Sequence, residues 1–147
     1  MSLYDSQIVG SIYCKRNCVV TQECIVHGDA VLGKLSEGEQ PYSILLIVEG
    51  EVTGSVRRNP AAKNCVVSGV IIKRGGTVGA IEDVNFADIA GTVRGDIRVT
   101  GNLILRKGCE MLGKAVTTHV YSEDGVELTN VRAYGGVLKD EPRFAYL

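Results

Sequence analysis

The residues with the clearest potential for chemistry lie near the N-terminus, where cysteines and a histidine cluster as Cys14, Cys18, Cys24 and His27. Thiolate sulfur and imidazole nitrogen are the usual ligands of zinc. However, Cys24 and His27 are three positions apart, which places them on opposite faces of a strand. The three residues between Cys14 and Cys18 also depart from common zinc spacing. Free cysteine often behaves as a small buried apolar residue, so we predict no metal ligands here.

Two segments, residues 28–34 and 108–114, have the Gly-x4-Gly-Lys spacing of a phosphate-binding loop. That loop needs a Ser or Thr after the lysine to hold Mg²⁺, and a helix whose N-terminus faces the phosphate. Here Leu35 and Ala115 follow the lysines, and neither segment is followed by a helical pattern. We therefore predict no nucleotide and no other cofactor.

The remaining candidate for acid–base chemistry is His119, which lies in a Thr-Thr-His-Val stretch. No carboxylate or nucleophile is linked to it by spacing, so a solvated or hydrogen-bonded histidine at a strand end is expected. Charged residues of both signs are interspersed along the chain, which indicates a solvated face. The sequence predicts no catalytic residues, and we expect that the protein is not an enzyme.

The elements that would position these side chains are strands, and residues 89–105 show the pattern most clearly. Every second residue there is apolar or glycine, and most of the intervening residues are polar. This period of two is typical of extended chain, but the run exceeds one ordinary strand of about 5–6 residues. Val93, Val99 and Leu105 also recur every six residues, so three six-residue sides would form a coil of 18 residues. The pattern predicts an all-β, triangular solenoid.

A repeat of Gly-x-apolar triplets supports one continuous domain over residues 1–147, with an irregular N-terminal segment and a tail over residues 134–147. The triplets begin at Gly33, Gly54, Gly79, Gly95 and Gly113. The two longest intervals hold polar, proline-bearing segments, residues 36–42 and 57–64, which we interpret as insertions at coil corners. Residues 66–72 are apolar almost without a break, which indicates that their outer face is covered.

Composition limits the partners and the compartment. The formal net charge of −1 lacks the basic signature of a nucleic-acid-binding protein. No apolar run approaches the roughly 20 residues of a membrane span, and no signal peptide is visible. The five cysteines are odd in number and irregularly spaced, unlike a disulfide framework. A reducing compartment, and hence the cytoplasm, is the expected location.

Two segments resemble the bactofilins, a family of polymer-forming bacterial cytoskeletal proteins. Residues 91–113 read GTVRGDIRVTGNLILRKGCEMLG, and residues 48–56 read VEGEVTGSV, which is similar to the opening of the bactofilin domain. The resemblance covers residues 44–115. It implies a right-handed β-helix that stacks end to end into filaments without nucleotide. It also implies association with the membrane or cell envelope from its cytoplasmic side, although the N-terminus does not match the family's short membrane-binding segment.

Two other functions remain open at this point. A left-handed hexapeptide-repeat β-helix would support an acyltransferase or a carbonic-anhydrase-like enzyme, but it prefers a small residue four positions after each aliphatic one. Val93 and Val99 are instead followed by Ile97 and Leu103. A carbohydrate-binding β-helix would show clustered aromatic residues or carboxylates, and neither is seen.

Self-association of identical copies is the interaction that the sequence favours. A solenoid ends in a coil with unpaired strand edges, which recruit further strands unless a polar cap covers them. No helical cap is evident, and the chain ends in an apolar stretch. We expect contacts between copies to involve Leu128, Phe144, Tyr146 and Leu147.

Overall fold

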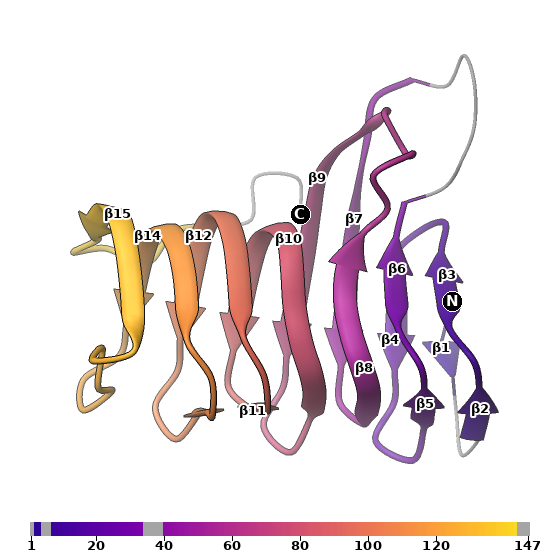
Figure 1. The fold of residues 1–147 in the computed structure, drawn as a ribbon, viewed down its shortest axis with the longest axis horizontal. Coiled ribbons are helices and arrows are strands. Elements are labelled where there is room, and N and C mark those ends of the chain that lie inside the picture. Colours follow the sequence, from indigo (N-terminus) through magenta and orange to yellow (C-terminus); the bar gives the residue numbers. More distant parts are fainter. Residues whose placement is uncertain (1, 4–6, 34–39, 144–147) are drawn as a thin grey trace.

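The structure, a computed structural model, describes residues 2–3, 7–33 and 40–143, and within these residues it is all-β with no helix. All strand pairs are parallel. The strands lie side by side along the long axis, from the indigo N-terminal end to the yellow C-terminal end (Figure 1). This ladder of parallel strands is the arrangement expected of a β-solenoid.

The pairing divides the strands into three ladders, one for each side of a coil. Long strands bend and contribute to more than one ladder. The first ladder contains β2 (Gln7–Val9), β5 (Ile25–His27), the start of β8 (Glu51–Arg58), the start of β10 (Thr77–Ile89), β11 (Thr92–Val93) and β13 (Glu110–Met111).

The second ladder contains β3 (Ile12–Cys14), β6 (Ala30–Leu32), the end of β8, the middle of β10, and the starts of β12 (Ile97–Leu105), β14 (Ala115–Ser122) and β15 (Val131–Val137). The third ladder contains β1 (Ser2–Leu3), β4 (Cys18–Val20), β7 (Tyr42–Val48), β9 (Cys65–Ile72) and the ends of β10, β12, β14 and β15.

The core runs along the axis inside the three ladders, and stacked side chains of similar size fill it. In the first ladder Val26, Val52, Val78 and Val93 lie in register and are fully buried. The predicted alternation in residues 89–105 is confirmed, because Val93, Ile97, Val99, Leu103 and Leu105 are all buried. Burial of each such side chain contributes about 1.5–3 kcal/mol before conformational entropy is counted.

Glycines stack at the corner between the first and second ladders. A Cβ atom on Gly79 would lie 2.5 Å from the carbonyl oxygen of Gly54, and one on Gly95 would lie 2.7 Å from that of Gly79. Only glycine permits such a close approach of neighbouring coils. The predicted triplet series is wrong in its first member, because Gly28 rather than Gly33 packs against Gly54.

The described parts of the two predicted insertions, residues 40–42 and 57–64, lie together at one corner of the solenoid, and residues 36–39 lie outside the described residues. Tyr42 pairs with Cys65, and the Tyr42 amide donates to the Asn64 carbonyl at 3.0 Å. Figure 1 shows β7 and β9 rising side by side beyond the other strands. The register of β7 with β9 shifts between Tyr42 and Ser43 and is then regular as far as the pair of Val48 with Ile72.

The outer face of the third ladder carries a second apolar cluster. Leu45, Phe86 and Ile104 are buried there, and the partly buried residues packed against them are Ile47, Val67, Ile71 and Tyr121. The expectation that the outer face of residues 66–72 is covered is confirmed in part, because Val67 and Ile71 are partly buried there whereas Val66 is 46% exposed. Ile104, which alternation alone placed on the polar side, is 1% exposed because it belongs to this outer cluster.

Candidate functional site

The strongest candidate site is the pair of solenoid ends, where strand edges are unpaired. Among the described strands, β2 pairs only with β5 and β3 only with β6 at the N-terminal end. At the C-terminal end β13 pairs only with β11, and β15 only with β14. Each of these edges presents backbone N–H and C=O groups along the axis, where another strand can pair with them.

Exposed apolar side chains gather in the same two end coils. Val9 on β2 is 91% exposed and Tyr13 on β3 is 60% exposed. Tyr134 and Val137 on β15 are 71% and 63% exposed. Scattered surface apolar residues are ordinary, but a concentration at unpaired edges indicates surfaces for association.

Val137 shows most directly that the C-terminal end is open. It pairs with Val120, which pairs with Leu103, and both of these partners are buried core residues. Val137 therefore occupies a core position of the coil, yet it is exposed because no coil follows it in the described chain. A further coil stacked on β15 would bury it.

Of the predicted self-association residues, only Leu128 lies within the described part of the chain. It is partly buried and packs against the core in the last coil, together with Val126 and Val131. Phe144, Tyr146 and Leu147 lie outside the described residues. Sequence analysis missed Val9, Tyr13, Tyr134 and Val137, although Val131 and Val137 repeat the six-residue spacing of the core and so carried a usable signal.

The described part of the C-terminal tail leaves the last coil and returns along the outer face of the third ladder. The Leu138 amide donates to the Val120 carbonyl at 2.7 Å. Glu141, Pro142 and Arg143 then line a surface cavity of about 400 Å³ with Ile71, Phe86, Asp88, Ile104 and Arg106. The tail residues as far as Arg143 thus contribute to the cover of the outer apolar cluster.

A group of charges centred on Arg106 holds the tail in this position. Its guanidinium donates to both Asp88 carboxylate oxygens, at 3.0 and 2.7 Å, and forms an ion pair with Glu141 of the tail. Arg106 also lies 3.6 Å from Glu123. The hydrogen bonds to Asp88 raise the pKa of Arg106, while a hydrogen bond from the Lys107 amide lowers the pKa of Glu123. Bidentate arginine–carboxylate pairs of this kind are geometrically specific.

Arg106→Gln is expected to lower the free energy of unfolding by about 1–3 kcal/mol, because it leaves the largely buried Asp88 carboxylate without its charged partner. Urea denaturation followed by circular dichroism would measure the change. The matched control is Arg98→Gln, since Arg98 and Asp83 are 4.0 Å apart with exposures of 70% and 63%. That variant should lie within about 0.5 kcal/mol of the parent. If the two variants lose equal free energy of unfolding, the pair of Arg106 with Asp88 contributes no more than an exposed ion pair, and this prediction is wrong.

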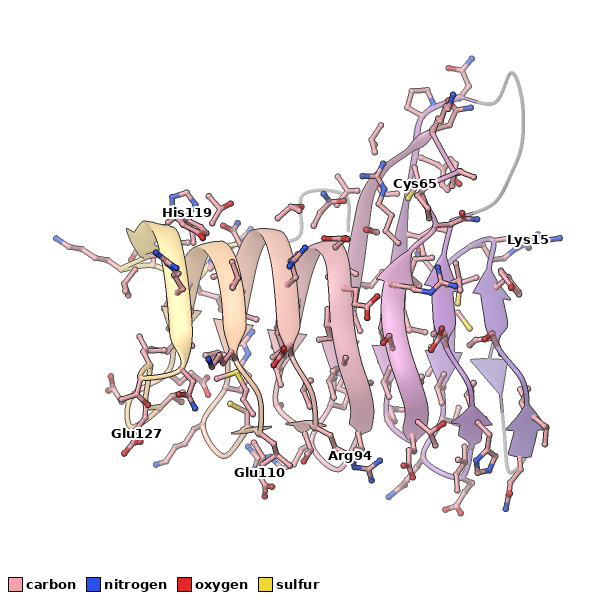
Figure 2. All side chains as sticks on the ribbon, in the orientation of Figure 1. Lys15, Cys65, Arg94, Glu110, His119 and Glu127 are labelled. Atoms are coloured by element: carbon pink, nitrogen blue, oxygen red, sulfur yellow. The ribbon has the colours of Figure 1, made fainter. Side chains whose placement is uncertain are left out.

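The sides of the solenoid carry charges of both signs that pair between coils. Arg94 bonds to Glu51 at 2.9 Å, and Arg57 lies 3.4 Å from Asp29. Arg94 and Glu110 both lie at the lower edge of the molecule in Figure 2. Such surface pairs contribute little to stability. Their mixed signs give these faces no preference for a polyanion or a polycation.

The N-terminal cysteines and His27 are not brought together. Cys14, Cys18 and Cys24 are buried in the core, whereas His27 is exposed and hydrogen-bonds to Gln7 at 3.1 Å. The prediction that Cys24 and His27 face opposite sides is confirmed. Within the described ranges, no group of three or more His, Cys, Asp or Glu side chains is arranged to hold a metal ion.

The two phosphate-loop matches belong to the solenoid repeat. Residues 30–32 form β6 inside the first match, and Ala115 begins β14 directly after the second match, where a nucleotide-binding loop would have its helix. Gly108 adopts a φ of 86° in the turn after β12. His119, labelled in Figure 2, packs against Gly135, because a Cβ atom added to Gly135 would lie 2.5 Å from Nε2 of His119.

Comparisons with known proteins found no matching family model, no matching curated protein and no matching solved structure. In the described part of the chain, no helix has the length and apolarity needed to cross a membrane.

Proposed function

We propose that this protein is a structural scaffold whose copies stack end to end into filaments without nucleotide, in the manner of the bactofilins. The proposed architecture is a right-handed, triangular β-helix in a single domain. The protein is not an enzyme in this proposal, and its principal partner is another copy of itself. It acts in the cytoplasm, at the inner face of the membrane or cell envelope.

The observation that carries this proposal is the open state of both described ends. Unpaired parallel edges and exposed apolar side chains occur together at β2 and β3 and again at β15. Val137 also occupies a core position, and it is exposed because no further coil packs on it in the described chain. An interface formed there would combine backbone hydrogen bonds with apolar burial, which is the way that strands add to a sheet edge.

The sides of the solenoid also favour end-to-end assembly over side-by-side assembly, because charges on the sides already pair within one copy. Contacts between ends that rest on apolar burial and backbone hydrogen bonds are screened little by salt, unlike contacts between surface charges. End-to-end assembly should therefore persist at moderate salt.

The five cysteines are free thiols, which suits a reducing compartment.

Val137→Arg is expected to weaken self-association about tenfold or more, because a guanidinium would have to be desolvated in the interface. Val137 is 63% exposed, so the fold itself should tolerate the change. Sedimentation velocity over a range of protein concentrations would measure the shift toward smaller species.

The matched control is Val66→Arg, which makes the same change at a 46% exposed valine of β9, away from the ends. It should leave the distribution of sizes unchanged. If Val66→Arg reduces assembly and Val137→Arg does not, the copies associate through their sides and the proposal is wrong.

A further inference from the structure

The last described residues, 138–143, form a strap across the outer face of the third ladder. The strap starts beside β14, where the Leu138 amide donates to the Val120 carbonyl at 2.7 Å. It then reaches a cavity of about 400 Å³ that is also lined by residues of β9, β10 and β12. The strap therefore crosses several strands as it leaves the C-terminal edge of the solenoid.

The side chains beneath the strap are apolar. Phe86 and Ile104 are 6% and 1% exposed, although they belong to the outer cluster and not to the core. Ile71 on the adjacent strand is partly buried in the same cluster. Pro142 of the strap lines one cavity with these three side chains. The strap thus contributes to the burial of an apolar surface on the side of the solenoid.

A single charged contact anchors the strap to the solenoid. Arg106, directly after β12, forms an ion pair with Glu141 of the strap. Two hydrogen bonds from its guanidinium to Asp88 hold Arg106 in position for this contact. The other strap residues from Lys139 onward are exposed, apart from the partly buried Pro142. A segment with so little buried surface can detach while the solenoid remains folded.

Detachment of the strap would leave an apolar patch whose border is complementary to itself. Phe86, Ile104 and Ile71 lie on three adjacent strands of one sheet face, and a contiguous apolar patch of this kind marks a surface for association. Arg106 and Glu123 place charges of both signs 3.6 Å apart at the border. A second copy related by a two-fold axis presents the same patch and the opposite charge to each of these residues. Two sheet faces packed in this way lie about 10 Å apart.

We propose that the strap is an autoinhibitory segment that keeps the third ladder from binding a second copy. While the strap is closed, the copies present no apolar patch on this side. When the strap is released, the outer face of the third ladder binds the same face of another copy. The inference concerns the sides of the solenoid, so it goes beyond the proposed end-to-end assembly and does not depend on it.

The test uses the full chain with Val137→Arg, which weakens contacts between ends. Glu141→Lys is added to release the strap, because it sets a second positive charge against Arg106. Asp140→Lys is the matched control, since it makes the same kind of change at the neighbouring exposed residue of the strap. Sedimentation velocity over a range of concentrations should show dimers for the Glu141→Lys protein. The control and Val137→Arg alone should give the same smaller species.

A second measurement reports release of the strap itself. At protein concentrations too low for dimers, the fluorescence of the apolar dye anilinonaphthalene sulfonate should rise with Glu141→Lys and not with Asp140→Lys. A further change, Ile71→Arg, places a charge in the exposed patch and should abolish the dimers formed by the released protein. Circular dichroism would check the fold of each variant.

Several results would overturn the inference. These are equal sedimentation and dye fluorescence for Glu141→Lys and Asp140→Lys, and dimers that survive Ile71→Arg. Binding of the released protein to vesicles of phosphatidylcholine and phosphatidylglycerol without formation of dimers would assign the face to lipid instead. Failure of the proposed end-to-end assembly would appear separately, as a parent protein no larger than Val137→Arg, and the comparison of the strap variants would still decide this inference.

Discussion

Val99→Asp is expected to unfold the protein at 25 °C. Val99 is 2% exposed and pairs with the buried Val84 inside the solenoid. An ionised carboxylate at this point would lack both water and a charged partner, and burial of such a group costs several kcal/mol. Because natural domains are stable by only about 5–15 kcal/mol, most of the stability would be lost. The far-ultraviolet circular dichroism spectrum and a urea titration would report the loss.

The neighbouring position provides the control for this prediction. Arg98 is exposed, and its pairing with Asp83 at 4.0 Å is between two solvated side chains. Arg98→Ser should therefore change the free energy of unfolding by about 0.5 kcal/mol or less. A stable Val99→Asp protein beside an unfolded Arg98→Ser protein would show that the inward and outward faces have been exchanged.

Gly79→Ala is expected to cost about 2–3 kcal/mol although it adds a single methyl group. The new Cβ would lie 2.5 Å from two carbonyl oxygens, those of Gly54 and Thr53 in the preceding coil. These atoms belong to the backbone of a paired strand, so relief of the clash requires that two coils move apart. Thermal unfolding of the two proteins would measure the difference.

A glycine in open space serves as the control for the steric argument. Gly125 has a φ of 87° and no atom within 4 Å of an added Cβ. Gly125→Asn should be tolerated within about 1 kcal/mol, because asparagine accepts this backbone conformation. If Gly79→Ala is as mild as Gly125→Asn, close stacking of the coils does not determine the glycines at that corner.

The all-β fold and the inward face of residues 89–105 could be predicted from the sequence because a period of two survives every bend of a coil. Six-residue sides keep the same parity, so Val93 and Val99 both face the core. The burial of Ile104 could not be predicted in this way, because it depends on an outer cluster assembled from β7, β10 and β12. Alternation identifies one buried face of a strand and gives no sign of a second.

The positions of the coils near the insertions were harder to predict. Gly33 fits the triplet pattern, but Gly28 occupies the stacked position because the strand after it, β6, pairs with the end of β8. A long insertion removes the constant spacing by which equivalent residues are recognised. The exposure of Val137 was missed for a related reason, since it arises because no coil follows this residue in the described part of the chain and not from its own sequence pattern.

Electron microscopy of the purified wild-type protein in negative stain, without nucleotide, tests the proposed assembly most directly, and sedimentation at low and moderate salt should accompany it. We expect filaments whose subunits repeat along the solenoid axis, and sedimentation that is nearly unchanged by salt. A protein that remains monomeric at high concentration, dissociates when salt is added, or forms a uniform compact trimer would contradict end-to-end assembly.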